Sequence, residues 1–452
     1  MIFLQRRRLL IWLLKAYIRK WKKTILIFFG VGLFFFFLIY SLFSKFSPAL
    51  PFSQDREIGV LGVYDASNLP AEVLNNISYG LTTVGYDGKP KPLAAKNWKI
   101  ENEGKTYIFN IEENLRFSDG SKLTSKEINY NFENVQVQRP NKYTIVFKLK
   151  ENYSPFLITA SKPILKGKFT GLGEYKVIAI DYNGEFVSSV KLQSIKNSKN
   201  KITYQFYPTE DSLKVALALG EISETHDLSN ISFKKTSFNV FSNYTVKMRV
   251  NYNILATLFY NTQDKVLSDK RLRQALSYAL PNDFPQGKRN VTPYPPNFWA
   301  DRGNSLSYQQ DLEHSKLLFS QSSATSSSSL KLNIKTLPKY KDSAERIKNS
   351  WKEIGVKSEI EVVNSLPSNF QIFLGEFFIS KDPDQYTLWH SSQSNNITGY
   401  KSLRIDKLLE DGRQTVDFEN REKIYADFQK YLLDDSPASF LFFPYNYILT
   451  KK

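Results

Sequence analysis

The sequence predicts a mixed α/β protein that follows one membrane-spanning helix. Stretches in which polar and apolar residues alternate are interleaved along the chain with stretches in which apolar residues recur every three or four positions. A run of 20 residues without charge lies near the N-terminus. The composition, 42% hydrophobic and 15% aromatic over 452 residues, is typical of a globular chain with two or three cores.

The first element is a basic N-terminal segment. Residues 1–45 contain nine Lys or Arg and no acidic residue, so about half of the net charge of +17 lies there. No long basic run occurs in the rest of the chain. The sequence therefore gives no support to a nucleic-acid partner.

The second element is the uncharged run 24–43, which is long enough to cross a bilayer. Because most basic residues precede this run, residues 1–23 are predicted to be cytoplasmic and the chain after Lys45 to be outside the cell. A cleaved signal peptide is the alternative, but the run is longer than usual and no clear cleavage site follows. Residues 2–21 either lie on the inner membrane surface or only hold the N-terminus on the cytoplasmic side through their basic residues. Residues 46–54 are predicted to be a linker.

The next elements come from residues 105–149. Residues 105–111 and 143–149 alternate polar and apolar side chains, which predicts two half-buried strands. Between them, Thr124 and Glu127 have the T-x-x-E spacing of a capping box. Because an apolar stripe follows at helical spacing, residues 124–135 are predicted to form a helix.

Five elements follow in the C-terminal half. Amphipathic helices are predicted at residues 268–280, 342–355 and 420–433, each preceded by a capping residue or carrying a continuous apolar stripe. Strands are predicted from Val356 onward and at 438–449. The serine run 322–329 is predicted to be a mobile loop.

Several chemistries find no support in the composition. The chain has no cysteine, which excludes disulfides, thiolate metal sites and a lipid-modified cysteine. Its three histidines are far apart in the sequence, and no catalytic motif is present. We therefore expect no enzyme, no metal site and no cofactor. An enzyme that uses Glu376, Asp382 and Asp384 remains the least favoured alternative.

A series of short motifs resembles the family 5 extracellular solute-binding proteins, the receptor subunits of peptide and nickel ABC importers. Each motif is weak alone, but together they occur in the family's order and cover about residues 55–450. The matching segments are Pro92-Leu93-Ala94 before Trp98, Gly104-Lys105-Thr106-Tyr107, Phe117-Ser118-Asp119-Gly120, Gly171-Leu172-Gly173-Glu174-Tyr175, Ala216-Leu217-Ala218-Leu219-Gly220-Glu221-Ile222, Asp269 to Ala279, and Asp382-Pro383-Asp384.

The resemblance implies an α/β architecture in two lobes, the type II periplasmic-binding-protein-like fold, with an inserted subdomain. Such lobes close on a ligand, usually an extended oligopeptide, and dock on a permease driven by an ATPase. The predicted parts are lobe I (55–82, 167–262 and 434–452), the inserted subdomain (83–166) and lobe II (263–433). The alternative function is a membrane-tethered sensor or scaffold that uses the same fold without transport.

Residues 375–400 align with the family segment that carries ligand contacts. In the alignment on Asp382-Pro383, Ile379 takes the place of the Asp that holds a peptide's ammonium group, so a free amino terminus should not be recognised in the usual way. Either Asp382 or Asp384 has taken over that role, or the ligand is internal, blocked or not a peptide. A gap in the alignment and a simple turn at 382–384 are the alternatives.

Three more residues complete the predicted ligand-binding set. Trp389 follows the Asp-Pro-Asp segment, Asn396 lies in the polar loop after it, and Trp299 lies in a proline-rich loop. Each has a structural alternative, since Trp389 and Trp299 can pack in a core and Asn396 suits any loop. Trp98 and Trp351 are predicted to be structural.

Overall fold

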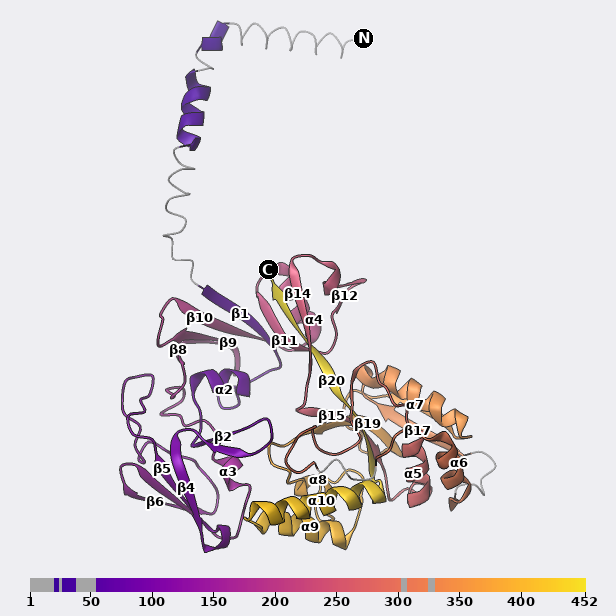
Figure 1. The fold of residues 1–452 in the computed structure, drawn as a ribbon. Helices are drawn as coiled ribbons and strands as arrows, with labels where there is room; N and C mark the ends of the chain where they lie inside the picture. The colour runs from indigo at the N-terminus through magenta and orange to yellow at the C-terminus, as the bar shows by residue number, and fades with distance from the viewer. Residues whose placement is uncertain (1–19, 24–26, 38–53, 302–306, 324–329) are drawn as a thin grey trace, which may run out of the picture. The chain divides into compact units, whose positions relative to one another are not determined.

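A computed structural model describes residues 20–23, 27–37, 54–301, 307–323 and 330–452. The chain forms two compact units, Met1–Gln54 and Asp55–Lys452 (Figure 1). The predictions for residues 1–19, 24–26, 38–53 and 324–329 lie outside the described residues.

Before Gln54, the described residues of the N-terminal unit, 20–23 and 27–37, are helical. The apolar side chains of the second helical stretch are exposed, including Phe28, Phe29 and Phe36. In the described part of the chain, no helix combines the length and apolar character that a membrane crossing needs.

The second unit confirms the mixed α/β class, and its strands form several sheets. The strands are β1 (Gln54–Leu61), β2 (Thr82–Val84), β3 (Pro90–Pro92), β4 (Ala95–Glu101), β5 (Thr106–Ile111), β6 (Val135–Asn141), β7 (Thr144–Leu149), β8 (Tyr175–Asn183), β9 (Phe186–Ser194), β10 (Asn200–Tyr207), β11 (Glu224–Leu228), β12 (Ser232–Phe233), β13 (Thr236–Ser237), β14 (Tyr244–Val250), β15 (Ile254–Tyr260), β16 (Gly287–Arg289), β17 (Lys331–Thr336), β18 (Lys357–Val362), β19 (Ile372–Phe378) and β20 (Ala438–Lys451).

Helices cover these sheets and connect their strands. They are α2 (Ala71–Ile77), α3 (Phe156–Thr159), α4 (Glu210–Leu219), α5 (Lys270–Tyr278), α6 (Leu312–Ser320), α7 (Lys341–Glu353), α8 (Tyr386–Trp389), α9 (Leu403–Gln414) and α10 (Phe418–Asp435), with short 3₁₀ turns at Asn102–Gly104, Phe238–Val240 and Pro338–Tyr340.

One large mixed sheet runs through the second unit in the order β18-β17-β19-β15-β20-β11-β1-β10-β9-β8. Strand β20, of 14 residues, lies within this order and joins its two halves. Its first half pairs with β15 and β16, and its second half pairs with β11 and β14. Residues from the start, middle and end of the chain therefore share one sheet (Figure 1).

A separate antiparallel sheet has the order β4-β5-β7-β6. It contains both strands predicted in residues 105–149, and its core includes the buried side chains of Tyr107, Phe109 and Phe147. This sheet falls within the predicted inserted subdomain, whose exact limits and those of the two lobes stay predictions.

The helix predicted at residues 124–135 is wrong. Thr124 and Glu127 make one of the two bonds of a capping box: the Thr124 N–H donates to the Glu127 carboxylate at 2.9 Å, but the Glu127 N–H donates to the Thr124 carbonyl and not to its hydroxyl. The segment forms turns and then enters β6. Ile128, Tyr130 and Phe132 all pack in the core of the four-stranded sheet. Their alternation has a period of two, so an extended segment buries all three and a helix would not.

The three helices predicted in the C-terminal half are confirmed as α5, α7 and α10, with ends shifted by a few residues. The predicted helix 268–280 begins with Ser268 as its expected cap, but Asp269, one position later, caps α5, and Asp417 caps α10. The predicted strands correspond to β18 and β20.

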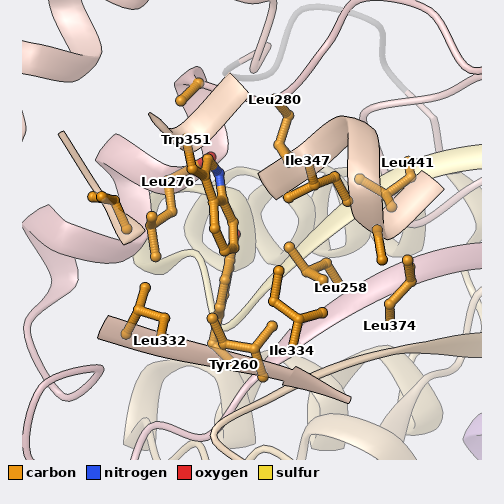
Figure 2. Close-up of a cluster of buried hydrophobic side chains, with 14 of the residues drawn as sticks. Leu258, Tyr260, Leu276, Leu280, Leu332, Ile334, Ile347, Trp351, Leu374 and Leu441 are labelled. Carbon is orange, nitrogen blue, oxygen red and sulfur yellow. The ribbon is translucent and has the colours of Figure 1, made fainter. Parts of the chain in front are cut away.

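The largest described core lies between α5, α7 and strands β15, β17 and β19 (Figure 2). Trp351 of α7 is fully buried there among Leu276, Leu332 and Ile334. Its indole Nε1 donates a hydrogen bond of 3.0 Å to the carbonyl of Leu276, which joins α7 to α5. Trp351 is therefore structural.

We expect Trp351→Phe to lower the free energy of unfolding by about 1–3 kcal/mol, because the Leu276 carbonyl loses its indole partner and stays buried. Urea unfolding of the full chain in detergent measures the change. Trp98→Phe, on the partly exposed side of β4, is the matched control and should cost less. Equal costs at the two positions would contradict this role.

Candidate functional site

A cavity of about 510 Å³ opens beside strand β19 in the second unit. Its walls come from β15, β19, α8, the loop after β18 and the loop after α8. Most of the lining is apolar: Phe259, Leu337, Leu366, Phe373, Phe378, Leu388, Trp389 and Ile397. The polar lining is Asn364, Ser365, Glu376, Ser394, Asn395 and Thr398. This volume and this balance are typical of a small-molecule or peptide side-chain pocket.

Glu376 is the ionisable group in that lining, and two neighbours engage its carboxylate. Lys339 lies 2.6 Å from Glu376 Oε1, and the Tyr340 hydroxyl donates to the same oxygen at 2.8 Å. Burial, reinforced by the Glu376 charge, raises the pKa of Tyr340, so its hydroxyl stays protonated as a donor. The mostly apolar wall of the cavity therefore contains one carboxylate, Glu376, whose charge is balanced by Lys339.

Two ion pairs support the segment between β19 and α8. Asp382 accepts two hydrogen bonds from Arg421 of α10, at 2.6 and 3.0 Å, and both side chains are buried. Asp384 accepts a bond of 2.7 Å from Arg413 of α9. Burial raises the pKa of Asp384, and the positive charge of Arg413 opposes this shift. Both carboxylates thus fix the start of α8 against two helices.

A family model described as bacterial extracellular solute-binding proteins, family 5, middle part, matches residues 89–399. That range is more than half of the chain and includes the cavity. The chain belongs to this family. Solute-binding proteins of family 5 are non-enzymatic ligand carriers, which confirms the expectation that the protein is not an enzyme.

Curated relatives and solved structures agree with the family. The solute-binding protein is 20% identical to the probable D,D-dipeptide-binding periplasmic protein DdpA of Escherichia coli, over 77% of this chain and 78% of the relative. It is 20% identical to the oligopeptide-binding protein AppA of Bacillus subtilis, over 85% and 84%. The ABC transporter substrate-binding protein CtaP of Listeria monocytogenes superposes with a TM-score of 0.72 at 22% identity, over 88% and 94%, which shows the same fold.

Of the six predicted ligand-binding residues, Trp389 lines the cavity of the solute-binding protein. Its indole Nε1 donates to the Gln385 side chain at 2.8 Å, so the ring is held in place within α8 and its cap. Asp382 and Asp384 pair with arginines instead, as described above.

The other three predicted residues lie outside the lining. Ile379 packs against the neighbouring core, and its N–H donates to the Asn253 carbonyl at 2.9 Å. Asn396 bonds the Tyr400 carbonyl at 2.7 Å and thereby shapes the loop that carries Asn395 and Ile397. Trp299 is buried against Phe418 and Tyr425, with its ring centroid 4.6 Å from that of Phe418.

Sequence reasoning missed most of the cavity wall. Phe373 and Phe378 belong to β19, Phe259 to β15, and the segment 364–366 to a loop. The β19 sequence IFLGEFF is almost continuously apolar, so it indicates a buried strand but neither which side chains share a face nor that β15 lies alongside. In the part of the chain that is described, no three His, Asp or Glu side chains are grouped to hold a metal ion.

A second charged cluster lies away from the cavity, where α2 meets β11. His226 contacts Glu72 through Nδ1 and Glu224 through Nε2, both at 2.6 Å, and Arg56 pairs with Glu224 at 2.8 Å. Burial opposes protonation of His226, but hydrogen bonds with Glu224 and Glu72 prevail and raise its pKa to about 9. The hydrogen bond with His226 lowers the pKa of Glu224 to about 2, against the opposing effect of burial.

We expect the stability of the solute-binding protein to fall as the pH rises from about 6.5 to about 9. The pKa of His226 is raised from its ordinary 6.5 to about 9, so its contribution is complete below 6.5 and lost above 9. The loss should be about 3 kcal/mol. Unfolding in urea at pH 6, 7.5 and 9.5 measures it, with His226→Gln as the control that should remove this slope. An unchanged slope in that variant would contradict the assignment.

Proposed function

We propose that this solute-binding protein is tethered to the membrane, binds oligopeptides outside the cell through the cavity beside β19, and delivers them to an ABC permease. The observation that carries the proposal is the cavity itself, with about 510 Å³ of space, mostly apolar walls and a few neutral polar groups. The apolar walls suit a peptide side chain, and the polar groups suit the peptide backbone, which needs hydrogen-bond partners.

The relatives support a peptide ligand. DdpA is named for D,D-dipeptides and AppA for oligopeptides, and each aligns with this chain along most of its length. In the cavity, the exposed Asn364 and Asn395 can exchange hydrogen bonds with a peptide backbone, because amide groups both donate and accept. The apolar walls would take one uncharged side chain of the ligand.

The predicted residues receive different roles in this proposal. Trp389 contacts the ligand directly. Asp382 and Asp384 act as supports, because Arg421 and Arg413 already occupy their carboxylates and leave them poorly placed to hold an ammonium group. Asn396 shapes the loop. Ile379 and Trp299 pack behind the site, so a free amino terminus is not a required feature of the ligand.

The membrane tether rests on the N-terminal sequence. Residues 24–43 carry no charge, and eight of the nine basic residues in 1–45 precede them. Such a segment would leave the N-terminus in the cytoplasm and the second unit outside.

Peptide capture by the full chain in lipid nanodiscs tests the proposal. A library of peptides of two to ten residues is incubated with the protein, and retained peptides are identified by mass spectrometry. We expect enrichment of peptides that contain large apolar side chains. No retained peptide at any length would overturn peptide binding. Peptide binding without uptake in cells that contain an ABC permease and its ATPase would favour the sensor alternative.

A further inference from the structure

One end of the large sheet carries exposed apolar side chains next to lysines. Leu219 at the end of α4 is 70% exposed, Val240 is 72% exposed and Phe241 is 38% exposed. The exposed Lys451 and Lys452 end the chain beside them. We call these five residues the end surface.

Contacts of neighbouring residues bring the parts of the end surface to the same end of the sheet. The Lys452 N–H donates to the Asn243 carbonyl at 2.8 Å, which places the chain end two residues from Phe241. The hydroxyl of Tyr244 donates to the Leu217 carbonyl at 3.2 Å, which joins the same loop to the end of α4. A Cβ built on Gly220 would lie 2.9 Å from Lys451 Nζ, so this lysine lies over the α4 terminus.

The strand register places the start of β1 at the same end of the sheet. Strand β1 runs parallel to β11, with Ile58 beside Glu224. Strand β11 runs antiparallel to β20, with Glu224 beside Thr450. Moving from Ile58 back to Gln54 therefore follows the same direction as moving from Thr450 on to Lys452. Figure 1 shows the C-terminus, β14 and the first residues of β1 at this end.

Chain length limits how far this end can lie from the bilayer. Ten residues separate the uncharged run 24–43 from the start of β1 at Gln54. Fully extended, they span at most about 35 Å. If residues 24–43 are the proposed tether, the start of β1 can lie no farther from the bilayer than this linker length, and the end surface lies at the same end of the sheet as the start of β1.

We propose that the end surface docks on anionic lipid headgroups of the outer membrane face, a step that rests on the proposed tether. Val240, Phe241 and Leu219 would enter the boundary between headgroups and acyl chains, as apolar residues of peripheral proteins do. Lys451 and Lys452 would be attracted to the negative surface. The exposed Glu221 and the exposed Asp55 at the start of β1 oppose this attraction, whereas the exposed Lys234 and Lys235 of the β12–β13 hairpin, which precedes Val240, add to it. Docking would fix the orientation of the second unit.

The absence of cysteine in the chain allows a site-specific test. A bimane fluorophore on Val240→Cys reports contact with nitroxide-labelled headgroups in vesicles that contain the full chain. The matched control is Leu403→Cys at the start of α9, which is 89% exposed but outside the end surface. In vesicles with 30% phosphatidylglycerol, we expect the fluorophore at position 240 to be quenched at least about threefold more than that at position 403.

Reversing the charge of the two lysines tests whether electrostatic attraction drives the docking. The double variant Lys451→Glu and Lys452→Glu should lower the docked population at least about fivefold. Pure phosphatidylcholine vesicles should have a similar effect, whereas Lys401→Glu should not. Equal quenching at 240 and 403 in a chain that still floats with vesicles overturns the docking and leaves the tether standing. A chain that does not float with vesicles overturns both, while peptide capture is measured separately.

Discussion

Arg421→Ala is expected to lower the free energy of unfolding by about 3–5 kcal/mol, because it leaves the carboxylate of Asp382 buried without its partner. The two side chains are 8% and 6% exposed, and the pair makes two hydrogen bonds at 2.6 and 3.0 Å. Arg421 also donates from Nε to the Gly412 carbonyl at 2.8 Å, so the variant also loses this contact between α10 and α9. Urea unfolding of the full chain in detergent measures the loss.

Two further variants separate the pair from general damage to the core. Arg421→Lys keeps the charge but lacks the planar fork, so it should recover less than half of the lost free energy. The double variant Asp382→Leu and Arg421→Met removes both charges and should be more stable than Arg421→Ala. A double variant that is no more stable than the single one would show that packing, rather than the stranded carboxylate, determines the cost.

Local sequence patterns predicted elements well where packing agreed with them. The caps and apolar stripes of α5 and α10 specify helices, and both helices place those stripes in cores. At Thr124 and Glu127 one bond of the capping box, from the Thr124 N–H to the Glu127 carboxylate, formed without a helix. A helix cap contributes about 1 kcal/mol, which is less than the burial of Ile128 and Phe132 provides.

The candidate site was less predictable because its residues meet only after folding. The cavity joins Phe259 of β15, Leu337 before α7 and Trp389 of α8, which are separated by up to 130 positions. Single-chain patterns identify which face of a strand is apolar but not which distant strand supplies the opposite wall. The partners of Asp382 and Asp384 were hidden for the same reason, since Arg421 and Arg413 belong to helices 29 to 39 residues away.

Ser365→Trp is expected to weaken the binding of peptides with large apolar side chains about 10- to 100-fold. Ser365 lines the cavity at an exposed position, so an indole there can fill the space without disturbing a core. Exclusion of one apolar ligand side chain forfeits about 1.5–3 kcal/mol of burial, which corresponds to that loss of affinity. Calorimetric titration of the full chain with a peptide recovered from the capture experiment measures the change.

Ser368→Trp is the matched control, because Ser368 is exposed in the same loop but does not line the cavity. It should leave both affinity and unfolding unchanged. If both tryptophan variants bind the peptide as the unsubstituted chain does, the ligand does not occupy this cavity. If only Ser365→Trp weakens binding, and more for peptides with Phe or Leu than for those with Ala, the apolar wall beside Trp389 selects the ligand by side-chain size. The peptide's charge would then matter little, because Lys339 already neutralises Glu376.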